Sequence, residues 1–192
     1  MSEHEPFTAT VRNFDHWRAA WLRCFQTQDW TPAEVEGDRV YFRRGFPHPD
    51  WSAYGIDVST DLAVVLSLTT ERRNEPLVSV EAVFSRTEDA EKFVIATIAD
   101  LVRIAAKQEP IFWQWEDAGI DPRLGVAKVT DSDLAVCKEI RGLSHLPAAE
   151  VFTCYFTAGD KASFGLVSNA NAPLSRVILM SFDDMDHVFN SG

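Results

Sequence analysis

His48 with Asp50, and Cys154 with His145, are the residue pairs of this 192-residue chain that most directly suggest catalysis. A carboxylate near an imidazole can orient it as a general base. A cysteine beside a histidine can form a reactive thiolate pair. Both arrangements also arise without a function, because His48 lies in a Pro-containing loop and Cys154 lies in an apolar run typical of a core strand. We therefore favour a structural role for each pair.

The segment Asp183-Asp184-Met185-Asp186-His187 is the best candidate for a metal site, because it offers hard oxygen ligands and an imidazole close together. The interpretation that we favour is that Asp183 caps a terminal turn and that the rest is a solvated acidic end. The common motifs for phosphate loops, hydrolase nucleophile elbows, paired cysteines and zinc-protease histidines are absent from the sequence. The sequence predicts a protein that is not an enzyme and has no cofactor and no metal site.

Arginines gather in one part of an otherwise acidic chain, on a predicted hairpin, the loop after it and a later turn. They are Arg39, Arg43, Arg44, Arg72 and Arg73. If the fold brings them together, they form a polar recognition rim. The alternative that we favour is that Arg39 and Arg43 pair with Glu34 and Glu36 across the hairpin, each pair contributing roughly a few tenths of a kcal/mol.

The hairpin tip Glu36-Gly37-Asp38 and the aromatic loop 46–51 are the best surface candidates for binding a partner. Rigid aromatic side chains in a Pro-braced loop lose little conformational entropy on docking. A loop folded back on the core fits the pattern equally well. The candidate partner-binding residues are Glu36, Gly37, Asp38, Arg43, Arg44, Phe46, His48, Asp50, Trp51, Arg72 and Arg73.

The chain carries 29 acidic residues against 18 Lys and Arg, a formal net charge of −11. This charge disfavours binding to nucleic acid or to an anionic membrane, because both depend on Lys and Arg. The N-terminus lacks an apolar signal segment, and no stretch approaches the roughly 20 apolar residues of a membrane span. Three widely spaced cysteines, each in an apolar pattern, are typical of buried, reduced thiols. We expect a cytoplasmic protein.

Helical and strand periodicities alternate along the first half of the chain. After Asn13, interpreted as an N-cap, a helix is predicted whose apolar stripe is Phe14, Trp17, Trp21, Cys24 and Phe25. A hairpin of strands 34–36 and 39–44 follows, with Gly37-Asp38 in a type II′ turn, and then strands over 54–58, 62–68 and 77–84. Ser85 to Glu88 matches a capping box that opens a long helix. Short connections favour an antiparallel meander with this helix packed on it.

Residues 108–124 are rich in Trp and punctuated by proline, and they are the predicted connection between two halves. Beyond them the pattern predicts a hairpin of strands 126–130 and 134–140, a buried strand over 151–156, a helical turn capped by Asp160, and a strand or helix over 175–182. We expect an α+β fold with antiparallel sheets, an N-terminal amphipathic helix and a long central helix on the sheet. Residues 1–192 form a single compact domain, either undivided or as two packed halves of about 1–107 and 125–192.

Residues 64–103 combine a strand ending Leu66-Ser67-Leu68-Thr69-Thr70-Glu71-Arg72, an apolar strand, and a helix from Asp89-Ala90-Glu91-Lys92-Phe93 to Asp100-Leu101-Val102-Arg103. This order resembles the immunity-protein family of actinobacteria that neutralises necrotizing NAD-glycohydrolase toxins. The loop Gly142-Leu143-Ser144-His145-Leu146-Pro147 is similar to one in that family. The resemblance covers about half of the chain and implies a cytosolic, non-enzymatic protein that occludes the active-site cleft of a cognate toxin domain.

The acidic composition agrees with this resemblance. An enzyme that binds dinucleotide phosphates presents cations, so an acidic inhibitor offers complementary charge, and Glu36 and Asp38 would imitate substrate phosphate. One alternative is a small acidic secretion chaperone, which would expose an apolar groove. A second is an enzyme with an uncommon site where His48, His145 or His187 meets carboxylates. We expect a monomer that binds one protein partner.

Overall fold

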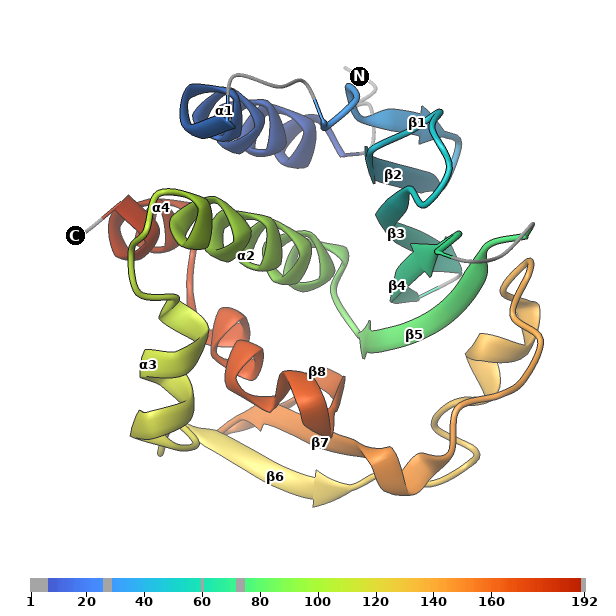
Figure 1. Cartoon of the computed structure of the whole chain (residues 1–192). Helices are drawn as coiled ribbons and strands as arrows, with labels where there is room; N and C mark the ends of the chain where they lie inside the picture. Colours follow the sequence, from blue (N-terminus) through green and yellow to red (C-terminus); the bar gives the residue numbers. More distant parts are fainter. Residues whose placement is uncertain (1–6, 26–28, 60, 72–74, 191–192) are drawn as a thin grey trace, which may run out of the picture.

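In the residues that the computed structural model describes, 7–25, 29–59, 61–71 and 75–190, an antiparallel sheet of eight strands is the frame of the fold. The strand order is β1-β2-β3-β4-β5-β8-β7-β6 (Figure 1). The strands are β1 Glu34–Glu36, β2 Arg39–Arg44, β3 Ser52–Ser59, β4 Leu62–Thr69, β5 Leu77–Phe84, β6 Leu124–Lys128, β7 Phe152–Thr157 and β8 Asp160–Ser168. With the helices below, they confirm the predicted α+β class and the antiparallel meander from β1 to β5.

Helices lie on one face of this sheet, which we call the helix face. They are α1 Thr8–Phe25, α2 Thr87–Ala105, α4 Phe182–Asn190 and the 3-10 helix η3 Asn169–Leu179, and α3 Ile111–Ala118 packs against η3. The sheet curves around α2, with α1 and α4 beside it (Figure 1). The opposite, outer face of β4, β5 and β8 packs against residues 129–151, which include the 3-10 helices η1 Ala135–Glu139 and η2 Ala149–Val151. None of the described helices is long and apolar enough to cross a bilayer.

Strand β4 is apolar on both faces because two cores meet on it. Ala63 and Val65 belong to the core shared with the helices, whereas Val64 and Leu66 belong to a second core beneath residues 129–151. Successive side chains of a strand point to opposite faces. The continuous apolar run predicted as a strand over 62–68 is therefore a strand between two layers.

Charged side chains buried on α2 hold its neighbours in place. Asp100 accepts hydrogen bonds from the backbone N–H groups of Ile111 and Phe112, each at 2.7 Å, at the start of α3. Arg103 donates from Nη1 to the carbonyl oxygen of Phe189 at 2.8 Å, near the end of α4. Both helices are thus tied to α2 by side chains, and their ends are set by residues distant in sequence.

Both predicted helix caps in the first half are wrong. Helix α1 begins at Thr8, so Asn13 lies inside it and donates from Nδ2 to the carbonyl oxygen of Ala9 at 3.0 Å. Ser85 does not cap α2, because its Oγ instead accepts the N–H of Phe164 in β8 at 2.8 Å. A tertiary hydrogen bond thus replaces the predicted cap at Ser85, whereas Asn13 bonds within its own helix.

The inner stripe of α1 is shorter than predicted. Phe14, Trp17 and Trp21 are buried, whereas Cys24 and Phe25 are exposed in the last turn of the helix. The prediction of three buried thiols is therefore wrong for Cys24, since the last turn of α1 leaves it in solvent.

Two segments predicted as irregular or extended are helical. The connection 108–124 contains α3, and 134–140 contains η1 instead of a strand. Leu134, Cys137 and Ile140 are buried at every third residue, which is the period of a 3-10 helix and not of a strand.

The end of the chain also differs from the pattern. Asp160 begins β8 and caps no helical turn, because Gly159, with φ +98°, closes a tight turn back from β7. Residues 175–182 contain the end of η3 and the first residue of α4. The strand alternative for this region is therefore wrong.

Candidate partner-binding surface

Strand β2 sends its two consecutive arginines to opposite faces of the sheet. Val40 and Phe42 point into the helix-side core, so alternation places Arg43 on the outer face. Arg44 lies on the helix face, with its guanidinium carbon 4.5 Å from the ring centroid of Trp21. The hypothesis of a single arginine rim is therefore wrong for this pair, because the pleat of the strand separates them.

Arg43 is the centre of an aromatic cluster on the outer face. Its guanidinium carbon lies 5.2 Å from the ring centroids of both Tyr41 and Phe46 and 5.9 Å from that of Trp51. The rings of Phe46 and Trp51 meet edge to face at 5.8 Å. Arg43 also forms an ion pair with Glu34, which confirms the predicted cross-hairpin pairing of these two residues. We call Tyr41, Arg43, Phe46 and Trp51 the Arg43 cluster.

The loop between β2 and β3 is anchored at both ends and exposed between them. The N–H of Gly45 donates to the carbonyl oxygen of Asp29 at 2.6 Å, and the N–H of Thr70 donates to that of Trp51 at 3.0 Å. Phe46 keeps 41% of its surface exposed, and His48 and Asp50 are exposed as well. The loop is therefore not folded back on the core.

The tip of the β1–β2 hairpin has the predicted turn. Of its two central residues only Gly37 has a positive φ, +62°, as a type II′ turn requires. Glu36 pairs with Arg39 in the register, directly beside this turn. The turn leaves Glu36, Gly37 and Asp38 exposed at the end of the sheet.

An acidic hollow of about 270 Å³, which no sequence pattern predicted, lies beside the tip. Glu36, Asp38, Arg39, Asp57 and Glu139 line it, so that four carboxylates meet one guanidinium. Arg39 pairs with Asp57 of β3 at 2.7 Å, and not with Glu36 as predicted, although both residues lie opposite it in the register. Burial raises the pKa of Asp57, and Arg39 opposes that rise.

A second hollow lies on the helix face, behind the loop. It measures about 480 Å³, and Arg44, Asp50, Asp29 and Glu71 contribute charged side chains to its lining. The predicted binding residues thus divide between two places. The acidic hollow and the Arg43 cluster share the outer face of the hairpin, whereas Arg44 and Asp50 line the hollow behind it. Arg72 and Arg73 lie outside the described residues.

The acidic segment 183–187 forms the first turns of α4. Ser181 and Asp184 make a reciprocal cap, in which Asp184 accepts the N–H of Ser181 at 2.9 Å and Ser181 Oγ accepts the N–H of Asp184 at 3.1 Å. The cap is therefore Ser181 with Asp184, and not Asp183 as predicted. Among the described residues, no three or more His, Cys, Asp or Glu side chains are arranged so that they could hold a metal ion.

The cysteines lie in different environments. Burial raises the pKa of Cys137 to about 11 and also raises the pKa of Cys154, which is half-buried on β7. His145 is exposed in the loop before η2. Burial therefore disfavours the thiolate that a nucleophile at Cys154 would need.

No protein-family model matches the chain, and no curated protein matches it. A solved structure with a similar fold is Rv3902c from M. tuberculosis, with a TM-score of 0.57 and 11% sequence identity. The match covers 92% of this chain and 87% of that one. At this identity the likeness establishes the fold alone.

Proposed function

We propose that the protein is a cytoplasmic immunity protein that binds a cognate toxin domain of the NAD-glycohydrolase kind and occludes its active-site cleft. The observation that carries the proposal is that one face of the β1–β2 hairpin holds both an acidic hollow and the Arg43 cluster. The sequence resemblance over residues 64–103 names the class of toxin.

The acidic hollow supplies the charge that such a partner needs. A cleft that binds the phosphates of a dinucleotide is lined with cations, and complementary charge accelerates the encounter and fixes its orientation. Glu36 and Asp38 stand at the exposed tip, and Glu139 adds a third carboxylate from η1. In the complex, the tip carboxylates take the place of substrate phosphates.

The Arg43 cluster supplies an anchor of a different kind. Tyr, Trp and Arg dominate the residues that carry most of the binding energy at protein interfaces. Here the rings and the guanidinium already contact one another, and Glu34 balances the charge of Arg43. An anchor that is ordered before binding loses less conformational entropy when the partner docks.

The test is co-expression with the product of the adjacent gene, followed by measurement of binding between the purified proteins. We expect the chain to rescue the host from the toxicity of that product. The double substitution Glu36→Lys with Asp38→Lys should slow association about tenfold or more at low salt, because it reverses the charge of the tip. The matched control Asp117→Lys with Asp183→Lys makes the same charge change at exposed sites on α3 and α4 and should leave the rate near that of the wild type.

Substitution of the anchor should act on dissociation instead. Arg43→Ala and Trp51→Ala should each weaken binding about 30-fold, the size of a typical hot-spot residue. Rescue that is unaffected by the tip and anchor variants would show that another face binds the toxin. Absence of both rescue and binding would remove the immunity function itself.

A secretion chaperone is the second candidate, and exposed apolar side chains favour it. Trp113, Ile120 and Val126 each keep at least half of their surface in solvent. A chaperone would stabilise a secreted neighbour without rescuing the host from it. The co-expression experiment therefore separates the two functions.

A further inference from the structure

Strand β6 is a free edge of the sheet. It lies last in the strand order and pairs on one side with β7, and no described residue pairs with its other side. An edge strand presents unpaired N–H and C=O groups, which another extended segment can bind. Val126, at its centre, has 50% of its surface exposed.

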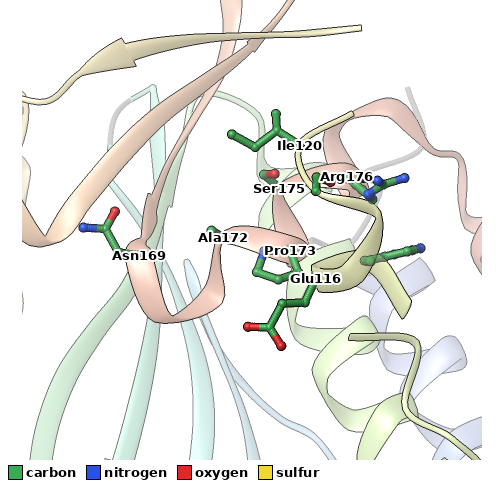
Figure 2. Close-up of a pocket in the computed structure, with 9 residues that line it drawn as sticks. Glu116, Ile120, Asn169, Ala172, Pro173, Ser175 and Arg176 are labelled. Atoms are coloured by element: carbon green, nitrogen blue, oxygen red, sulfur yellow. Dashed lines mark hydrogen bonds between the residues drawn. The ribbon is translucent and has the colours of Figure 1, made fainter. Parts of the chain in front are cut away.

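A pocket of about 200 Å³ lies between α3 and η3, and Ile120, Ala172 and Pro173 contribute apolar walls (Figure 2). Trp115 of α3 adds an aromatic side chain. An apolar cavity of about 150 Å³ is large enough to hold benzene. The pocket therefore has room for one leucine, isoleucine, methionine or phenylalanine side chain.

The pocket lies along the helix face of β6. Ile120 precedes the first residue of β6 by four positions, at one end. At the other end Asn169 accepts a hydrogen bond from Thr153 at 2.8 Å, and Thr153 is the β7 residue that pairs with Lys128. Leu124 is buried in the helix-side core, so alternation puts Val126 on the same face as the pocket.

The charged side chains around the pocket determine which charge an extended segment bound there should carry. Glu116 lines it, and Asp117 is exposed beside it on α3. Arg176, which also lines the pocket, donates to the carbonyl oxygen of Gly119 at 2.8 Å and lies 3.6 Å from Asp121, which also pairs with Arg123 at 2.8 Å. The exposed Lys128 lies at the far end of β6. The negative charge is therefore local to the α3 end, where Glu116 and Asp117 complement a Lys or Arg of the segment.

We propose that β6 and the α3–η3 pocket bind an extended segment of a partner protein, which adds a strand to the sheet and inserts one apolar side chain, flanked by Lys or Arg, into the pocket. Side chains of an added strand alternate, so every second one faces the pocket. A second copy of this chain fits less well. Its own β6 offers only the short Val126 side chain there, because Leu124 is buried in its own core.

The probe is a library of ten-residue peptides displayed on phage and selected on the purified full chain. We expect enrichment of peptides with one Leu, Ile, Met or Phe next to Lys or Arg. A selected peptide should slow amide hydrogen exchange at Gly125 to Lys128. Ala172→Leu, which fills the pocket, should weaken its binding at least tenfold, whereas Ala170→Leu, the same change at an exposed η3 residue outside the pocket, should not.

Ile120→Lys provides a second variant that does not depend on core packing, because 53% of this side chain is exposed. It removes an apolar wall of the pocket and adds a charge that repels Lys or Arg. This variant should also bind the selected peptide at least tenfold more weakly than the wild type. The proposal is overturned by a lack of enrichment, by equal binding to the Ala172→Leu and Ala170→Leu proteins, or by unchanged exchange at β6. A stable dimer through β6 that the peptide does not dissociate would assign the edge to a second copy instead.

Discussion

Removal of the Asp100 side chain should lower the free energy of unfolding by several kcal/mol, although Asp100 lies in no candidate binding site. Its carboxylate accepts the N–H groups of Ile111 and Phe112, each at 2.7 Å, at the start of α3. The helix has no side-chain cap of its own, since Pro110 precedes it. Asp100→Ala therefore leaves two N–H groups at the helix start without their acceptor.

The size of the expected loss in the free energy of unfolding follows from the burial of these groups. A lost helix cap costs about 0.5–2 kcal/mol, and a buried donor left without an acceptor costs about 1–3 kcal/mol. Ile111 is buried and Phe112 is partly buried, so the second N–H regains some hydration. Burial also raises the pKa of Asp100, so its removal relieves part of a desolvation cost. We expect a net loss of about 2–4 kcal/mol for Asp100→Ala and about half of that for Asp100→Asn, which keeps one acceptor oxygen.

Urea denaturation followed by far-UV circular dichroism measures this loss. A chain of this length should lose about 5–15 °C in Tm for such a change. The amides of α3 should also exchange hydrogen faster than those of β3 and β4. Asp117→Ala, an exposed change in the same helix, should stay within about 0.5 kcal/mol of the wild type. An Asp100→Ala protein as stable as this control would refute the assignment of Asp100 as the cap of α3.

Three further outcomes follow from burial. A Cβ at Gly165 would lie 2.6 Å from the fully buried Phe84 ring, so Gly165→Ala should lower the free energy of unfolding by about 1–3 kcal/mol in urea melts. Gly125→Ala should cost less, because the half-buried Phe156 ring that it meets can move. Equal losses for the two variants would contradict this. Cys24 should react first with a thiol reagent and Cys137 only on unfolding, because Cys137 is buried and its pKa is raised to about 11; rapid labelling of all three cysteines in the folded protein would be the contrary result. Burial raises the pKa values of Asp89, Glu91 and Asp100 in the folded state, so the native protein binds their protons more tightly than the unfolded chain does. The free energy of unfolding should therefore rise as pH falls from 7 toward the pKa values of these groups in the unfolded chain, near 4. Urea melts at pH 7, 6 and 5 check this, and a fall in stability over that range would count against it.

The strands could be predicted because their signal is local. The two-residue alternation of β2 and β3 reflects one buried face, whereas the apolar residues of β4 and of the end of β5 are buried on both faces. The tight turn at Gly37 also depends on a single residue with a positive φ. Each of these features is set by neighbours in the chain.

The helices were harder to place because distant residues define them. Helix α3 has only eight residues and begins where Asp100, eleven positions before Ile111, accepts its first N–H groups. Ser85 has the sequence of a cap but bonds to Phe164 in β8. Helices this short are marginal on their own, so tertiary contacts decide whether they form.

Part of the candidate surface was readable in the sequence and part was not. Once Val40 and Phe42 are placed in the core, strand alternation puts Arg43 and Arg44 on opposite faces of the sheet. The separation of the two arginines could therefore be predicted from the sequence. Glu139 is different, because its position depends on the period of its own segment. In a strand over 134–140, Glu139 would share a face with the buried Cys137. A period of three turns Leu134, Cys137 and Ile140 inward and leaves Glu139 outside, where it accepts a hydrogen bond from Ser59 at 3.0 Å and completes the acidic hollow.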